Sequence, residues 1–156
     1  MRITLITVSK TVVPWVKQGL DEYIGRLNRY IPFSLVEIPE LKGVKSFSEE
    51  QIKEREGMEI LKAAGNCEMI LLDEHGREFR SIEFADWLEK KLVHTGKDLC
   101  FIVGGAYGFS KEVYDAASAK LSLSKMTFNH QMVRMIFAEQ LYRAFTIIKG
   151  EPYHHE

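Results

Sequence analysis

The chain has 156 residues, of which 46% are hydrophobic and 28% charged, and its formal net charge is -1. This size and composition predict one globular domain over residues 1–156 that buries a core without metal or disulfide staples. A stand-alone nucleic-acid binder usually carries a clear basic excess, so the charge argues against tight binding to naked RNA. No run reaches the roughly 18–20 apolar residues of a membrane span, and the N-terminal run is too short for a signal peptide. We therefore expect a cytoplasmic protein with no membrane contact.

The two cysteines give no sign of a metal or redox site. Cys67 and Cys100 each stand at the front of an apolar run, far from any histidine or second cysteine. Neither belongs to a CxxC or a zinc-ligand spacing. We expect both to be reduced core residues, and we predict no metal site.

The chain opens with an apolar run, a helical pattern and a second apolar run. Residues 3–8 are a short β-branched run that predicts a buried strand, and residues 34–38 predict another, which Pro39 ends. Pro14 suits the first turn of the helix between them. The apolar residues of that helix share roughly one face: Trp15, Leu20, Tyr23, Ile24 and Leu27.

A loop, a second helix and a third strand follow. Residues 41–47 predict the loop. Residues 48–51 read Ser-Glu-Glu-Gln, a capping box, so a helix begins there and runs until Gly65 stops it. Residues 69–72, with the sequence MILL, predict a third strand.

The next stretch predicts a polar loop over residues 73–80, then a helix that Ser81 caps. A fourth strand over residues 99–103 ends in two glycines, and Ser110 caps a short helix that runs to about residue 119. The apolar positions of the helix after Ser81 are Phe84, Trp87, Leu88 and Leu92.

A brief strand over residues 121–123 and a long helix over residues 131–149 complete the pattern. Strands that alternate with helices predict an α/β fold with a mostly parallel sheet. Because the strands are apolar without alternation, we expect helices on both faces of that sheet. Ligands of such sheets bind beyond the carboxyl ends of the strands, so the residues just after each strand are the candidate site.

The first candidate is residues 102–110, IVGGAYGFS, where a strand runs into Gly104 and Gly105. Glycines let a backbone approach a ligand closely, but the same pattern fits a tight strand-to-helix turn equally well. The sequence is neither a P-loop nor GxGxxG. Tyr107 either stacks on a flat ring or covers the loop.

The second candidate is residues 121–144, LSLSKMTFNHQMVRMIFAEQLYRA, where a strand leads through a polar turn into the final helix. The hydroxyls of Ser122, Ser124 and Thr127 suit hydrogen bonding to a heterocycle, although the serines also fit one face of a strand. We interpret the methionines of this segment as core or interface packing.

The third candidate is the final helix and the tail that follows it. The helix is apolar nearly all round, which predicts burial partly in the core and partly in a subunit interface. Glu139 and Arg143 form either an internal i, i+4 ion pair or a charged patch at a composite site. The tail ends in Tyr153, His154 and His155.

Taken together, these segments resemble the RlmH family of SPOUT-class methyltransferases. The resemblance spans the whole chain and rests on the FSLVEIP run, IVGGAYGFS, the block over residues 121–144 and the closing PYHHE. It implies a parallel sheet with a C-terminal trefoil knot, a homodimer, and S-adenosylmethionine (SAM) bound in the knot. It also implies methylation of N3 of a pseudouridine in bacterial 23S rRNA, on the assembled ribosome. The sequence departs from the family pattern at Asn129, often proline, and at His155, often arginine.

The family motifs place the cofactor at the strand ends found above. The implied cofactor-binding residues are Leu72, Gly104, Leu123, Ser124, Lys125, Met126, Thr127 and Phe128.

For catalysis, we hypothesise that His130 is the base or an orienting group, with helix capping as its alternative role. Arg134 and Arg143 are candidates for phosphate or carbonyl contacts. Tyr153 and His154 complete the site, from the partner subunit in our hypothesis. Two other functions remain open: an α/β nucleotide-binding enzyme that uses the glycine loop, and a non-catalytic ribosome-associated factor.

Overall fold

The computed structural model describes residues 1–156 and contains one five-stranded sheet in the order β2-β1-β4-β3-β5. Every pair of neighbouring strands is parallel. The predicted α/β fold with a parallel sheet is therefore confirmed. The strands are β1 (Ile3–Val8), β2 (Phe33–Ile38), β3 (Glu68–Glu78), β4 (Leu99–Val103) and β5 (Ala119–Ser122).

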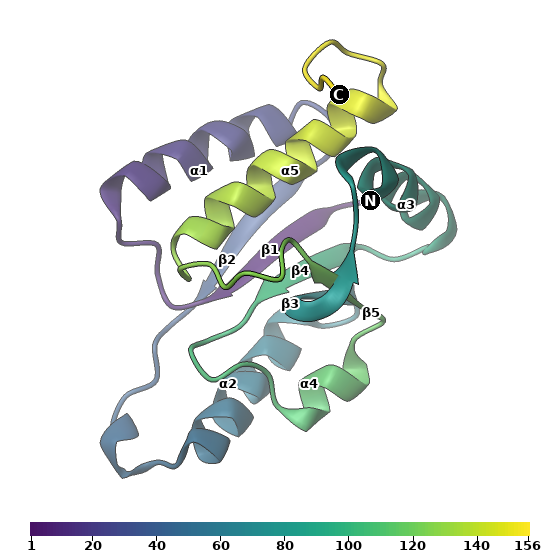
Figure 1. Cartoon of the computed structure of the whole chain (residues 1–156). Coiled ribbons are helices and arrows are strands. Elements are labelled where there is room, and N and C mark those ends of the chain that lie inside the picture. Colours follow the sequence, from purple (N-terminus) through teal and green to yellow (C-terminus); the bar gives the residue numbers. More distant parts are fainter.

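Helices cover both faces of the sheet (Figure 1). Helices α1, α3 and α5 pack on one face, where α5 contacts both of the others, and α2 and α4 lie together on the opposite face. A single 3-10 turn lies in the loop expected before α2. The elements are α1 (Pro14–Leu27), η1 (Val44–Ser46), α2 (Glu49–Ala64), α3 (Ser81–His94), α4 (Lys111–Ala116) and α5 (Met132–Ile148).

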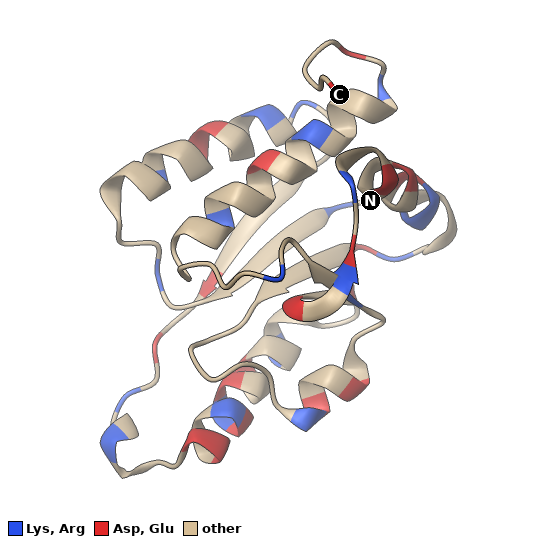
Figure 2. Ribbon diagram, in the orientation of Figure 1, with Lys and Arg blue, Asp and Glu red and all other residues tan.

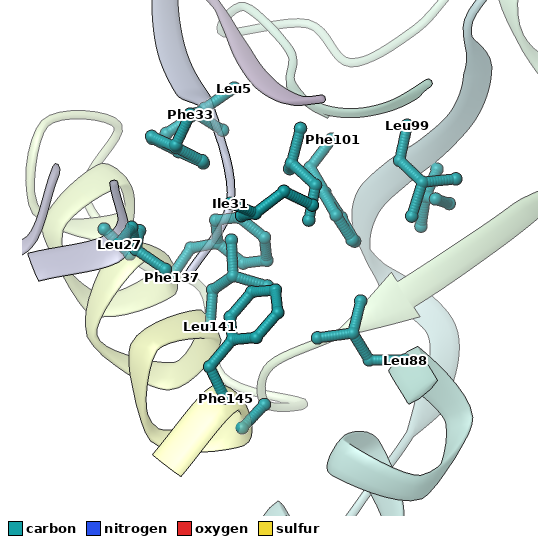
Figure 3. Packing of buried hydrophobic residues seen from close by; sticks show 14 of the residues in the cluster. Leu5, Leu27, Ile31, Phe33, Leu88, Leu99, Phe101, Phe137, Leu141 and Phe145 are labelled. Atoms are coloured by element: carbon teal, nitrogen blue, oxygen red, sulfur yellow. The ribbon is translucent and has the colours of Figure 1, made fainter. Parts of the chain in front are cut away.

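The core lies on both sides of the sheet, because successive strand residues point to opposite faces. Leu5 and Phe101 belong to a cluster of 19 buried residues under α1, α3 and α5. Their neighbours Ile6 and Ile102 belong to a cluster of 11 under α2 and α4. Figure 3 shows the larger cluster, in which the rings of Phe101 and Phe137 lie 4.7 Å apart. This contact seats α5 on the central strand.

The predicted capping residues begin two of the three helices to which they were assigned. The Ser48 hydroxyl accepts from the Gln51 N–H at 3.2 Å and the Gln51 side chain accepts from the Ser48 N–H at 2.9 Å, so the capping box is confirmed. The Ser110 hydroxyl caps α4. The prediction for Ser81 is wrong. Ser81 is already helical, and the Glu83 carboxylate accepts from the Arg80 N–H at 2.7 Å.

Strand β3 continues to Glu78, through the polar run where the sequence predicted a loop. It pairs with β5 on both sides of a bulge, because Leu72 and Arg77 both align with Leu121. A Cβ on Gly76, in this bulge, would lie 2.6 Å from the backbone of β5. The loop prediction is wrong because backbone pairing holds this part of β3, which leaves its side chains free to be polar.

Two smaller predictions also differ from the structure. Trp15 does not share the burial of the apolar face predicted for α1, because it is 56% exposed, whereas Leu20, Leu27 and the unpredicted Val16 are buried. Helix α4 ends at Ala116, earlier than predicted. None of the helices is both long and apolar enough to cross a membrane.

Candidate active site

A cavity of about 450 Å³ lies beyond the carboxyl ends of β4 and β5, beside the bulge of β3. Its walls are the segments that follow β4 and β5, residues 72–75 of β3 and the start of α5. This is where parallel α/β sheets bind ligands. Seven of the eight positions that the resemblance assigned to the cofactor line it, and they come from β3 and from the segments after β4 and β5: Leu72, Gly104, Leu123, Ser124, Met126, Thr127 and Phe128.

Lys125 is the assigned position that the structure does not bring into the cavity. Its side chain is 84% exposed, and its ammonium lies 3.8 Å from the Glu78 carboxylate. It follows that Lys125 lies on the outer side of this loop, while its neighbours Ser124 and Met126 line the cavity.

The loop after β4 is both a tight turn and a wall of the cavity, so the two interpretations of its glycines hold together. A Cβ on Gly104 would lie 3.0 Å from the Phe109 ring, and one on Gly105 would lie 2.5 Å from the Glu56 carboxylate. Gly108 has a φ of 85°, a conformation that favours glycine. A side chain at Gly104 or Gly105 would thus meet a neighbouring side chain, and both glycines line the cavity. Glu56, which the sequence analysis missed, has a buried oxygen without a hydrogen-bond partner, and burial raises its pKa.

The loop between β5 and α5 is held by its own hydroxyl groups. The Ser122 hydroxyl donates to the Ser124 carbonyl at 2.9 Å, and the Ser124 hydroxyl accepts from the Met126 N–H at 3.0 Å. The Thr127 hydroxyl donates to the Glu74 carboxylate at 2.8 Å. These bonds shape the wall before any ligand is present.

Four further lining residues were not predicted: Asp73, Glu74, His75 and Tyr114. The Tyr114 hydroxyl donates to the Asp73 carboxylate at 2.6 Å, which ties α4 to the bulge of β3. Burial, reinforced by this carboxylate, raises the pKa of Tyr114 to about 12. Asp73, Glu74 and His75 directly follow the expected strand over residues 69–72, so the strand-end rule that selected Leu72 could have found these three.

His130 lies at the cavity, just before α5. The residue that caps this turn is Asn129, whose side-chain oxygen accepts from the N–H groups of Gln131 at 2.8 Å and Met132 at 3.3 Å. The His130 ring makes no hydrogen bond within the chain, and the residue is exposed. The capping alternative for His130 is therefore wrong, and its ring is free to meet a ligand.

The structure does not support the predicted substrate contact of Arg134, because its side chain is 0% exposed. Its guanidinium closes the turn after β1, where Ser9 has a φ of 76°. Burial lowers the pKa of Arg134, although the Glu37 carboxylate 3.6 Å away acts in the opposite direction. All five N–H donors of the guanidinium are hydrogen-bonded within the chain, so Arg134 has a structural role. Its acceptors, at 2.9–3.3 Å, are the carbonyls of Val8, Ser9 and His130 and the hydroxyls of Ser9 and Thr11.

The tail folds back on the far end of α5. The Tyr153 hydroxyl donates to the Glu139 carboxylate at 3.1 Å and lies 3.4 Å from the Tyr23 hydroxyl. Its ring packs edge-on against Tyr142. Burial, the bond to Tyr23 and the Glu139 charge raise the pKa of Tyr153, so this phenol stays protonated.

The internal ion pair between Glu139 and Arg143 is confirmed, with Arg143 Nη2 2.6 Å from Glu139 Oε1. This ion pair does not exclude the alternative of a charged patch at a composite site, because Arg143 also lies 3.1 Å from His154 Nδ1. The pair therefore anchors the tail. His155, the next residue, is exposed.

One chain does not bring the two groups of predicted catalytic residues together. His130 precedes α5, whereas Tyr153 and His154 bond to Glu139 and Arg143, which lie about 14 Å and about 20 Å further along the helix axis at about 1.5 Å per residue. In Figure 1 the tail lies at one end of α5 and the loop from β5 at the other.

Comparison with known proteins agrees with this architecture. The family model described as "Predicted SPOUT methyltransferase" matches residues 1–154. Proteins named "Ribosomal RNA large subunit methyltransferase H" are 55% identical in Bacteroides fragilis, 53% in Phocaeicola vulgatus and 50% in Flavobacterium johnsoniae, each over 100% of both chains. The chain belongs to the RlmH family of SPOUT methyltransferases.

A solved structure of the SpoU methyltransferase AviRb from Streptomyces viridochromogenes, in complex with AdoMet, has a weaker likeness to this RlmH-family chain. The alignment covers 96% of this chain and 61% of that one, with a TM-score of 0.44 and 13% identity. That likeness is too low to bear on the site.

The charges of this RlmH-family protein are mixed along its helices. Figure 2 shows Lys and Arg interspersed with Asp and Glu on both layers. The net charge of -1 agrees with this mixture. Long-range attraction to a polyanion is accordingly weak, and recognition has to rely on local contacts.

Proposed function

We propose that this protein is a SAM-dependent methyltransferase that methylates N3 of a pseudouridine in bacterial 23S rRNA. It acts as a homodimer on the assembled ribosome, in the cytoplasm. The observation that carries the proposal is the cavity at the strand ends, with the free ring of His130 at its edge. The rRNA substrate is supported by the name of the full-length relatives.

The residues around the cavity fit SAM. Its volume of about 450 Å³ falls within the roughly 300–1,000 Å³ of small-molecule sites. Leu72, Leu123 and Phe128 offer apolar surface for an adenine ring, and the glycine loop offers peptide groups. Asp73 and Glu74 place negative charge beside the cavity, which suits a cationic cofactor. When bound, SAM supplies a methyl group carried on a positively charged sulfur.

We also infer that the C-terminal part of the chain forms the trefoil knot of the SPOUT class. The support is local: β5 pairs with β3 both before and after the bulge, so β3 wraps past the backbone of β5. The close approach of Gly76 to that backbone fits such a crossing.

The chain's own residues have to remove a proton and stabilise charge. N3 of the target base loses its proton as it gains the methyl group, and negative charge spreads onto the neighbouring carbonyl oxygens. His130 accepts that proton in this scheme. N–H donors of the tail stabilise the carbonyl oxygens.

The separation along α5 between His130 and the tail residues supports the proposed homodimer. A second copy can place its tail beside the cavity of the first, which one chain cannot do. An apolar surface for such a contact exists at the N-terminal ends of α1 and α5, where Val12 is 70%, Trp15 56% and Met132 38% exposed. Gln131 hydrogen-bonds to the backbone of residues 10, 12 and 13 and so holds these ends together.

The first test is transfer of labelled methyl groups from SAM to ribosomes that lack this modification, followed by nucleoside mass analysis. A methylated pseudouridine in 23S rRNA is the expected product. SAM binding without transfer would move the substrate elsewhere. If ATP or NAD stabilises the fold and SAM does not, the result would support a nucleotide-binding enzyme. Ribosome association that does not depend on SAM would support a non-catalytic factor.

His130→Ala tests the base assignment. A variant that binds SAM normally and melts like the wild type should lose most of its turnover, since general-base catalysis contributes about 100-fold or more. Unchanged turnover would overturn the assignment.

Mixed dimers test the composite site. Neither His130→Ala nor a Tyr153→Phe, His154→Ala double variant should be active alone. Mixed in equal amounts under exchange, roughly half of the dimers carry both chains and one intact site each, so about a quarter of wild-type activity returns. If His130 and the tail act within one chain, the mixture stays inactive.

A further inference from the structure

The hydrogen-bond partner of His154 fixes where its proton sits. Arg143 Nη1 lies 3.1 Å from His154 Nδ1. A guanidinium has donors only and does not deprotonate in proteins, so Nδ1 has to be the acceptor. The neutral ring therefore carries its proton on Nε2. A second proton, on Nδ1, would remove the acceptor of this hydrogen bond and place two positive groups, the ring and the Arg143 guanidinium, against each other.

Arg143 is itself held by Glu139. One Glu139 oxygen accepts from Arg143 Nε at 3.1 Å and from Nη2 at 2.6 Å, and the same oxygen accepts from the Tyr153 hydroxyl. The guanidinium also lies 4.8 Å from the centre of the Tyr153 ring. Both members of the pair are mostly buried, with 24% and 19% of their side chains exposed. Arg143 consequently has little freedom to turn away from His154.

The other ring nitrogen of His154 has no partner. Nε2 is buried and makes no hydrogen bond. The charged groups facing the ring are Arg143 and Glu156, whose carboxylate lies 3.6 Å from Nε2 and also pairs with Arg80 at 3.2 Å. Buried N–H groups almost always find an acceptor. A ligand acceptor can therefore satisfy this nitrogen once the neighbouring Glu156 carboxylate moves away.

We propose that Glu139 and Arg143 are positioning residues that hold His154 as a neutral Nε2–H donor to a carbonyl oxygen of the target base. The proposal rests on the proposed function, in which the tail reaches the cavity of the partner subunit. As the new bond from N3 to the methyl carbon forms and the old bond to sulfur breaks, the N3 proton goes to another group, such as His130. His154 stabilises the charge that develops on the carbonyl oxygen and takes no proton.

The tautomer can be measured without any substrate. We expect long-range ¹H–¹⁵N spectra of the full-length dimer at neutral pH to show His154 as the Nε2–H tautomer, with the signal assigned by its loss in His154→Gln. Arg143→Gln should give a mixture of tautomers. Arg29→Gln, an exposed arginine outside this cluster, should leave the signal unchanged. An Nδ1–H or doubly protonated ring in the wild type would overturn the proposal.

Kinetics separate a donor from a base. The amide of His154→Gln can still donate, so its kcat should fall by less than about tenfold, while His154→Ala should lose about 100-fold with KM little changed. Arg143→Gln should lower kcat, and Arg143→Lys should recover part of it. Equal losses in His154→Gln and His154→Ala would overturn the donor role. An inactive wild type with the expected tautomer would instead overturn the proposed function and leave the positioning pair intact.

Discussion

Replacing Arg134 by methionine tests whether this arginine is structural. The change keeps most of the apolar stem but removes the donors to three backbone carbonyls and two hydroxyls. A buried acceptor left without a donor costs about 1–3 kcal/mol. Water can reach the partly exposed acceptors but not those of the buried residues Val8 and Thr11, so we expect the unfolding free energy to fall by about 3–5 kcal/mol.

Urea denaturation followed by tryptophan fluorescence measures this loss as a lower midpoint at unchanged slope. The matched control is Lys111→Met, which removes an exposed i, i+4 pair with Asp115 and should cost less than about 1 kcal/mol. A variant of Arg134 that is as stable as the wild type but inactive would refute the structural role and restore the original prediction of a substrate contact.

Three other changes follow from single contacts. Gly76→Ala should lower the melting temperature, because its Cβ would meet the backbone of β5 at 2.6 Å, whereas Gly25→Ala, with nothing within 4 Å in the interior of α1, should stabilise by about 0.5–1 kcal/mol. Gly105→Ala should weaken SAM binding at least severalfold in calorimetry, because its Cβ would displace the Glu56 carboxylate and shift the cavity wall, and unchanged affinity would contradict this. Burial alone would raise the pKa of Glu68, but hydrogen bonds from a lysine, a threonine and a serine lower it to about 2. Its stabilisation is therefore present above pH 4.5 and lost as pH falls toward 2, and Glu68→Gln should remove about 2 kcal/mol at neutral pH and flatten the acid limb of the stability curve.

The strands and most helix starts could be predicted because their signals are local. Continuous apolar runs mark a sheet covered on both faces, and a hydroxyl three residues before the N–H it caps is visible in the sequence. The cavity could be located for a related reason. In a parallel sheet the carboxyl ends of all strands meet at one edge, so residues far apart in sequence, such as Leu72 and Leu123, converge there.

What could not be predicted depends on partners that are distant in sequence. The polar residues of β3 do not look like a strand, because β5 holds them through the backbone. Arg134 looked like a substrate contact because an arginine on a helix usually faces solvent. Four of its five acceptors lie more than 120 residues away at and just after the end of β1, and no local sequence pattern indicates a buried charge there.

Helix α5 acts as a rigid spacer that is fastened by charge at both ends. Arg134 ties its first turn to the end of β1, and Glu139 with Arg143 ties the tail to its second half. Terminal residues are ordinarily loose, but here Tyr153 and His154 are packed and hydrogen-bonded within a single chain. If the proposed function is right, the partner subunit therefore meets tail residues that are already hydrogen-bonded within their own chain. Preorganisation of this kind removes the entropic cost of ordering the tail during catalysis.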